Sequence, residues 1–166
     1  EDLAGMKVRV MESKLNMGMV STMGGEPYPM AFADVYNALV KGTLDAAENN
    51  WASYISSSHY EVAKYITVDE HLRVPEMIIA SKRTLDKLSE EDQKIITECA
   101  KESTEIQIKL WKAYEEESIK TAEDAGCKIT YLDADQVALF QDAVESLYEA
   151  EGAAYKEIID AIKTVE

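Results

Sequence analysis

The feature that most constrains the fold of this chain is a long stretch without helix breakers, from Ser89 to Asp124. The stretch contains no proline or glycine, and Ser89 followed by the acidic Asp92 is a helix start close to a capping box. A helix of roughly 35 residues at about 1.5 Å per residue is roughly 50 Å long, more than a compact domain of this size needs. Its apolar stripe fades at Glu115, so part of the helix is expected to cross between two packing environments. The stripe consists of Ile95, Cys99, Ile106, Leu110 and Tyr114.

Short strands and helices alternate in the first third of the chain, which favours a mixed or parallel sheet covered by helices, an α/β fold. The extended segments are expected at 7–10, 26–30 and 44–48, and the helices at 14–23, 32–40 and 50–56. The near-continuous apolar run at 74–80 is typical of a buried strand. A further strand is expected to begin at Cys127, followed by helices at 135–149 and 152–164.

The first expected strand carries an arginine among β-branched residues. Val8 and Val10 lie on one face of this strand, and Lys7 and Arg9 lie on the other. A lysine would serve as well as an arginine on a plain solvent face, whereas the planar guanidinium matches a carboxylate with two parallel hydrogen bonds. Arg9 is therefore a candidate carboxylate-binding residue, and the alternative is an arginine on a wet strand face.

The charge of the chain excludes several classes of partner. Seventeen Lys and Arg residues against 32 Asp and Glu residues give a net charge of −15. Such a chain repels nucleic acid and anionic lipid, so neither is an expected partner, and an organic acid would need a locally placed cation. No apolar run approaches 18 residues, so no membrane insertion of this segment is expected. Two cysteines and two distant histidines do not form a zinc-like set, and no metal or cofactor is expected.

Several motifs in register resemble the solute receptors of TRAP transporters. They are Asp2-Leu-Ala-Gly-Met-Lys-Val-Arg-Val10, Pro27-Tyr-Pro-Met-Ala-Phe32, Asp34-Val-Tyr-Asn-Ala-Leu-Val-Lys-Gly42, Asp45-Ala-Ala-Glu-Asn49, His59-Tyr-Glu-Val-Ala-Lys-Tyr65 and Leu88-Ser-Glu-Glu-Asp-Gln-Lys-Ile-Ile96. The similarity covers essentially the whole chain but resembles only the second half of such a receptor. The chain also starts without an initiator methionine, and we therefore expect a processed or truncated protein.

The resemblance implies half of a two-lobe fold like that of periplasmic binding proteins, with a long interlobe helix. Residues 1–73 would belong to the second, ligand-binding lobe. Residues 74–110 would contain an interlobe strand and a segment of the first lobe, and residues 111–166 the end of the long helix and a return to the second lobe. The implied location is periplasmic or extracytoplasmic. The implied partners are a small organic acid and the membrane subunits of a TRAP permease.

Three residues match ligand-binding positions of the family. Arg9 resembles the arginine that clamps the ligand carboxylate, Asn49 the amide that hydrogen-bonds the same carboxylate, and Phe32 the aromatic wall of the cleft. Glu76 is a further candidate, because an acid at the start of the interlobe strand can accept hydrogen bonds from ligand hydroxyls. The alternatives are a core position for Phe32, a helix cap formed by Asn49 and Asn50, and an ordinary solvated acid at Glu76.

Glu12 directs the expectation towards one class of acid. It lies three residues after Arg9, where it would either pair with the arginine or repel a second carboxylate, which favours sugar acids over dicarboxylates. Two other functions compete with the receptor. The first is an acidic helical interaction module that binds no small molecule. The second is an enzyme acting on a carbohydrate acid through Glu48, Glu76 and His71, although no nucleophile elbow, phosphate loop or glycine fingerprint supports it, and we do not expect an enzyme.

Overall fold

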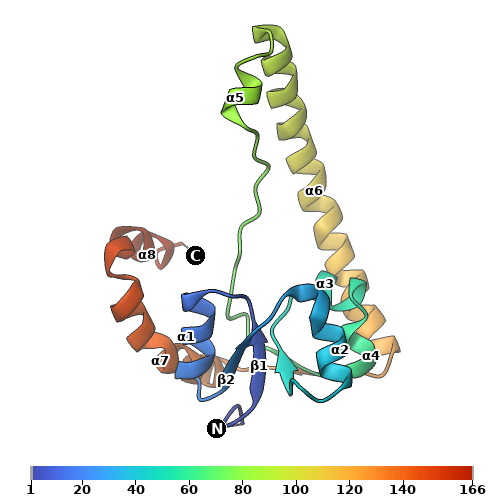
Figure 1. The fold of residues 1–166 in the computed structure, drawn as a ribbon, viewed down its shortest axis with the longest axis vertical. Coiled ribbons are helices and arrows are strands. Elements are labelled where there is room, and N and C mark those ends of the chain that lie inside the picture. Colours follow the sequence, from blue (N-terminus) through green and yellow to red (C-terminus); the bar gives the residue numbers. More distant parts are fainter. Residues whose placement is uncertain (1, 166) are drawn as a thin grey trace.

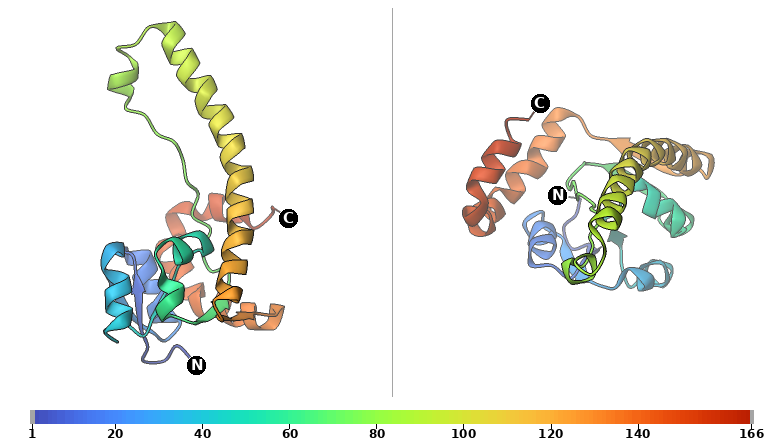
Figure 2. Two further views of the ribbon diagram at one scale, coloured as in Figure 1. Left: turned by 90° about the vertical axis from the view of Figure 1, so that its right-hand side faces the viewer. Right: turned by 90° about the horizontal axis from the view of Figure 1, so that it is seen from above.

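The computed structural model describes residues 2–165. Figure 1 shows a lobe that holds all the strands, with one long helix and one extended segment leaving it side by side. The two further views in Figure 2 show the same arrangement, with the arm formed by these two segments standing clear of the lobe. Among the helices of residues 2–165, none combines the length and the apolar character needed to cross a membrane.

A three-stranded parallel sheet forms the centre of the lobe. Its strand order is β2 (Glu26–Pro29), β1 (Lys7–Val10), β3 (Ala46–Ala47), so β1 is the central strand. The helices α1 (Lys14–Thr22) and α2 (Val35–Val40), the latter preceded by the 3-10 turn η1 (Phe32–Asp34), connect these strands. The prediction of a mixed or parallel sheet covered by helices is confirmed, and the sheet is parallel.

Two clusters of apolar side chains fill the lobe. The first surrounds Val8 and Val10 of β1 and extends to the inner face of α1, and the second joins α2 to Leu44. Val10 and Val35 are completely shielded from solvent. The helix α7 (Ala134–Glu151) packs against α1 (Figure 1). The α/β class predicted from the alternation of strands and helices is therefore confirmed.

A second, two-stranded sheet was only half predicted. The expected strand after Cys127 is β5 (Lys128–Tyr131), and it pairs in parallel with β4 (Tyr65–Val68), which was not expected from the sequence. The short helices α3 (Trp51–Ser56) and α4 (His59–Val62) precede β4. The phenol of Tyr54 joins this part of the lobe to β5, because it donates to the carbonyl of Ala63 at 2.6 Å and lies 3.3 Å from the sulfur of Cys127.

The long helix is confirmed as α6 (Glu90–Asp124), which has 35 residues. Ser89 caps it, because its side chain accepts a hydrogen bond of 3.1 Å from the Asp92 amide. The last turns of α6 pack into the lobe, where Ser118 and Ala122 are buried against α3. The stripe from Ile95 to Tyr114 is exposed along the arm, and Cys99, which lies on it, is also exposed.

The prediction of a buried strand at 74–80 is wrong for this chain. The segment is extended but is not a strand, and its apolar side chains are exposed, with Ile79 at 82%. A strand requires the backbone of a neighbour, and within residues 2–165 no segment pairs with this one. The segment leads to α5 (Lys82–Leu85) at the tip of the arm (Figure 1). At the other end of the chain, the turn η2 (Ala153–Tyr155) and α8 (Lys156–Ile162) follow α7.

Candidate carboxylate-binding site

Arg9 is buried at the centre of the sheet. β1 has a strand on each side, and only 6% of Arg9 is exposed, so the alternative of an arginine on a wet strand face is excluded. Its Nε and Nη2 atoms both donate to the carbonyl oxygen of Met30, at 3.0 Å each. These bonds use two of the five guanidinium N–H groups. Among residues 2–165, no hydrogen bond uses the other three, and two of these, one on Nη1 and one on Nη2, lie along the Nη1–Nη2 edge.

Phe32 lies beside this guanidinium. The centre of its ring is 5.5 Å from Arg9 Cζ, within the range of a cation–π contact. The backbone places it there, because β2 ends at Pro29, next to the Arg9-bound Met30, and η1 begins at Phe32. Phe32 is 42% exposed, so it is not the core residue of the alternative interpretation. A ring that is half open to solvent and packed on a buried cation can serve as one wall of a ligand cleft.

Asn49 and Asn50 form different hydrogen bonds. Asn50 caps α3, because its side chain accepts from the Ser53 amide at 2.8 Å. The cap therefore does not involve the side chain of Asn49, which follows β3. Its Oδ1 accepts from the Asn50 amide at 2.9 Å, and its Nδ2 lies 3.3 Å from Nδ1 of His59. Within the part of the chain that the structure describes, no hydrogen bond uses the second N–H of the Asn49 amide, which can donate to another acceptor.

His59 was not singled out by the sequence, yet it contacts two of the candidate residues. His59 is 3% exposed. Its ring centre is 5.4 Å from that of Phe32, and its Nδ1 lies next to the Asn49 amide. Burial lowers the pKa of His59 below its usual value, and the positive charge of Arg9 lowers it further. A lone histidine in a serine-rich turn carries no sequence signal that separates it from a surface residue.

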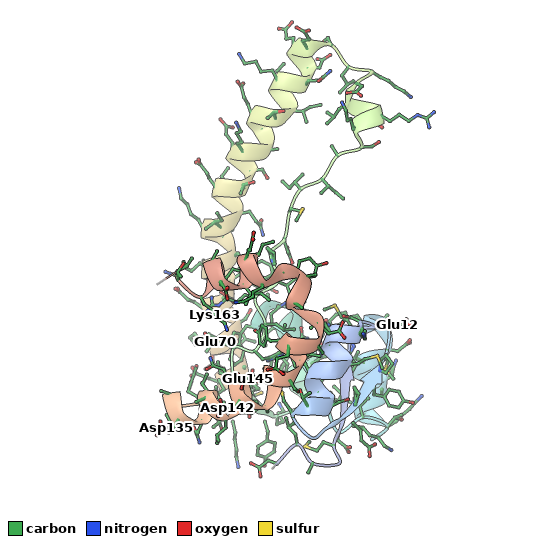
Figure 3. The ribbon with its side chains drawn as sticks, turned by 90° about the vertical axis from the view of Figure 1, so that its left-hand side faces the viewer. Glu12, Glu70, Asp135, Asp142, Glu145 and Lys163 are labelled. Atoms are coloured by element: carbon green, nitrogen blue, oxygen red, sulfur yellow. The ribbon has the colours of Figure 1, made fainter. Side chains whose placement is uncertain are left out.

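An acidic side chain does lie next to Arg9, but it is Glu48 rather than Glu12. Glu48 Oε1 is 3.7 Å from Arg9 Nη1, and its Oε2 is 3.9 Å from His71 Nε2. Glu12 is exposed, and Figure 3 shows it at the periphery of the lobe. The sequence held a signal for Glu48 as the acid beside Arg9, because Glu48 follows β3 and directly precedes the candidate Asn49.

The charge network continues from Glu48 through His71 to Asp69. His71 Nδ1 lies 2.6 Å from Asp69 Oδ1. The bond to Asp69, and secondarily the charge of Glu48, raise the pKa of His71 to about 9 against the opposing effect of burial. His71 is therefore a cation at neutral pH and cannot act there as a general base. Glu76, the third member of the alternative enzymatic set, is exposed on the extended segment and, among residues 2–165, forms no hydrogen bond or ion pair with Glu48 or His71.

A concave surface between α7 and α8 has the wrong charge for an acid. This shallow groove is lined by Asp142 and Glu145 of α7 and by Lys163, which follows α8 (Figure 3). Acids outnumber bases in it, and all of these side chains are near solvent, where charges are screened. An organic anion therefore has a stronger electrostatic reason to bind at Arg9.

Comparison with known proteins identifies the family of the chain. Residues 1–154 match the family described as bacterial extracellular solute-binding protein, family 7. The chain belongs to this family. A protein from Chromohalobacter salexigens named solute-binding protein is 40% identical over 149 residues, which cover 90% of this chain and 44% of that protein. The chain thus spans about half the length of the curated relatives it matches.

Two solved structures of TRAP periplasmic solute-binding proteins are similar over almost the whole chain. One, from Sulfitobacter sp. NAS-14.1 with bound β-D-galacturonate, is 45% identical with a TM-score of 0.88, covering 96% of this chain and 52% of that one. The other, from Roseobacter denitrificans with bound β-D-glucuronate, is 40% identical with a TM-score of 0.92, covering 99% and 55%. These proteins are receptors and not enzymes, and the predicted membership in this receptor family is confirmed.

Proposed function

We propose that this chain supplies the carboxylate-binding half of an extracytoplasmic receptor that captures a sugar acid of the uronate class. The other half of the cleft would come from a first lobe, as the half-length match to the relatives suggests. We also propose that the loaded receptor delivers its ligand to the membrane subunits of a TRAP permease. The division into lobe II residues 1–73, an interlobe and lobe I segment 74–110, and returning residues 111–166 belongs to the same proposal.

The observation that carries the proposal is that, within the described residues, the Nη1–Nη2 edge of the Arg9 guanidinium makes no hydrogen bond. Its Nε side is anchored on the Met30 carbonyl, which holds the side chain in one orientation before any ligand arrives. The Nη1–Nη2 edge then presents two parallel N–H groups, the arrangement that a carboxylate accepts with both oxygens. The remaining N–H of Asn49 would add a third bond, and the Phe32 ring would cover the carbon skeleton next to the carboxylate.

Glu48 supports a preference for acids with one carboxylate. It lies 3.7 Å from Arg9, so part of the arginine charge is already balanced before a ligand binds. One ligand carboxylate would gain the directional bonds, whereas a second carboxylate nearby would meet the Glu48 charge. Sugar hydroxyls, in contrast, can donate to Glu48 and to Glu76. The uronates bound to the two similar structures agree with this preference.

Capture and delivery would be coupled by closure of the two lobes. Ligand docks on Arg9, and closure buries the ion pair, which strengthens it because water is excluded. The closed state is favoured only by the amount by which the ligand binds it more tightly than the open state. The arm of α6 and the extended segment would join the lobes during this motion, which gives a reason for a helix much longer than its packing in this lobe requires.

A ligand panel tests the proposal on the receptor containing both lobes. Thermal shift and isothermal titration calorimetry are measured with D-glucuronate, D-galacturonate, succinate and the neutral sugar D-galactose. A uronate at 100 times its Kd is expected to add about 2.7 kcal/mol to the free energy of unfolding, a shift of several degrees in Tm. D-Galactose is the matched control, since it differs from D-galacturonate by the carboxylate. Binding of D-galactose as tight as that of D-galacturonate, or no binding of any acid, would refute the proposal.

A further inference from the structure

His59 lies between the proposed ligand groups, and its position depends on an unusual backbone. It is the first residue of α4 and follows Ser58, whose φ of 57° is in the left-handed region that residues other than glycine rarely adopt. This reversal between α3 and α4 allows α4 to begin at once, with His59 only 3% exposed. A strained residue next to a buried polar one marks a position that the surrounding structure has fixed.

The hydrogen bonds of Asn49 determine which form of His59 is present. The amide orientation is set because Oδ1 accepts from the Asn50 backbone amide, which can only donate. The Nδ2 group, a donor, therefore faces His59 Nδ1 at 3.3 Å, and this nitrogen must be the acceptor. The imidazole is then neutral with its proton on Nε2. A protonated ring would place two donors face to face.

His59 also contacts the aromatic wall. Its ring packs against Phe32 at a centroid distance of 5.4 Å and an angle of 52°, and Phe32 in turn packs on the Arg9 guanidinium. One buried side chain thus touches two groups that come from different loops, the one after β2 and the one after β3. A histidine that only filled the core would not need to contact both the amide of Asn49 and the ring of Phe32.

We propose that His59 is a positioning residue of the carboxylate site. Its Nδ1 takes one N–H of the Asn49 amide and thereby directs the other N–H towards a carboxylate held by Arg9, while its ring sets the distance of Phe32 from the guanidinium. The inference rests on the proposed function. It assigns His59 a role through Asn49 and Phe32 and not by contact with the ligand.

A double-mutant cycle tests whether His59 acts through Asn49. His59→Phe keeps a ring against Phe32 but removes the acceptor, and His59→Asn restores an acceptor near the position of Nδ1. With D-glucuronate and the two-lobe receptor, His59→Phe is expected to weaken binding about tenfold, the scale of one misdirected hydrogen bond. The same change made in Asn49→Ala is expected to have no further effect, and His59→Asn is expected to recover most of the affinity.

Three results would overturn the inference. Unchanged affinity in His59→Phe, or equal losses with and without Asn49, would mean that His59 does not act through the amide. Ring ¹⁵N NMR of the unaltered receptor, which needs no variant to fold, is expected to show a neutral His59 with the proton on Nε2, and a proton on Nδ1 would also overturn it. If the unaltered receptor bound no uronate, the proposed function would fail together with the inference, whereas the first three results leave uronate binding by Arg9 intact.

Discussion

Replacing Arg9 by alanine tests the central contact of the proposed site. Two charge-assisted hydrogen bonds from the Nη1–Nη2 edge would be lost, each on the scale of about 1.5–3 kcal/mol. Water that enters the gap recovers part of the lost binding free energy. In the other direction, Glu48 loses the cation 3.7 Å away, so its uncompensated charge repels a ligand carboxylate. We expect a net loss of at least about 2 kcal/mol, which corresponds to roughly a 30-fold increase in the Kd for a uronate.

The same substitution changes the folded protein, so binding and stability are measured separately. Arg9→Ala leaves the Met30 carbonyl without its two donors, and we expect the free energy of unfolding to fall by roughly 1–3 kcal/mol. Arg9→Lys keeps a positive charge beside Glu48 but loses the planar guanidinium. Its affinity for a uronate should therefore lie between that of Arg9→Ala and that of the unaltered receptor. Titration calorimetry gives the Kd, and urea unfolding gives the stability.

Arg73→Ala is the matched control for the loss of one positive charge. Its side chain is exposed and pairs with Glu70 outside the candidate site, so the affinity for a uronate should stay within about twofold of the unaltered receptor. An Arg9→Ala receptor that folds and binds D-glucuronate within threefold of the unaltered protein would refute the clamp, whatever its stability.

Three further predictions concern neighbouring residues. The pKa of His71 is raised to about 9 from an ordinary value of 6.5, so its stabilising effect is complete below pH 6.5 and is lost as the pH rises through 9. The difference in the free energy of unfolding between His71→Gln and the unaltered protein, measured by urea unfolding, should therefore be about 3 kcal/mol smaller at pH 10 than at pH 6. Asn50→Ala should cost about 1 kcal/mol of stability through loss of the α3 cap, with the Kd for a uronate unchanged. Glu48→Gln should tighten binding of a sugar diacid about fivefold relative to a uronate, measured by calorimetry, because the charge that repels a second carboxylate is gone.

Each of these has a contradicting outcome. A pH-independent difference for His71→Gln would mean that the Asp69 bond does not hold a proton on the imidazole. A loss of uronate affinity in Asn50→Ala, at unchanged stability, would mean that Asn50 and not Asn49 is the ligand amide. An unchanged preference in Glu48→Gln would remove the electrostatic argument for monocarboxylates.

Local patterns in the sequence were sufficient for most of the secondary structure. The unbroken run after Ser89 and its cap predicted α6, and the alternation of short strands and helices predicted a mixed or parallel sheet. These features depend on residues near one another in the chain, where hydrogen-bonding patterns and backbone preferences act directly. β4 was missed because four residues carry little periodicity, and its partner β5 begins 60 positions after β4 ends.

The sequence by itself determined that an arginine suited to a carboxylate stands in a strand of an acidic α/β chain, and the receptor family followed from motifs in register. Only the tertiary structure decided that this strand is central, which buries Arg9, and that the acid beside it is Glu48 and not Glu12. It also brought His59 to Asn49 and left the apolar run at 74–80 uncovered. The physical reason is that burial and charge pairing depend on which strands become neighbours and in what register, and sequence spacing does not encode that choice.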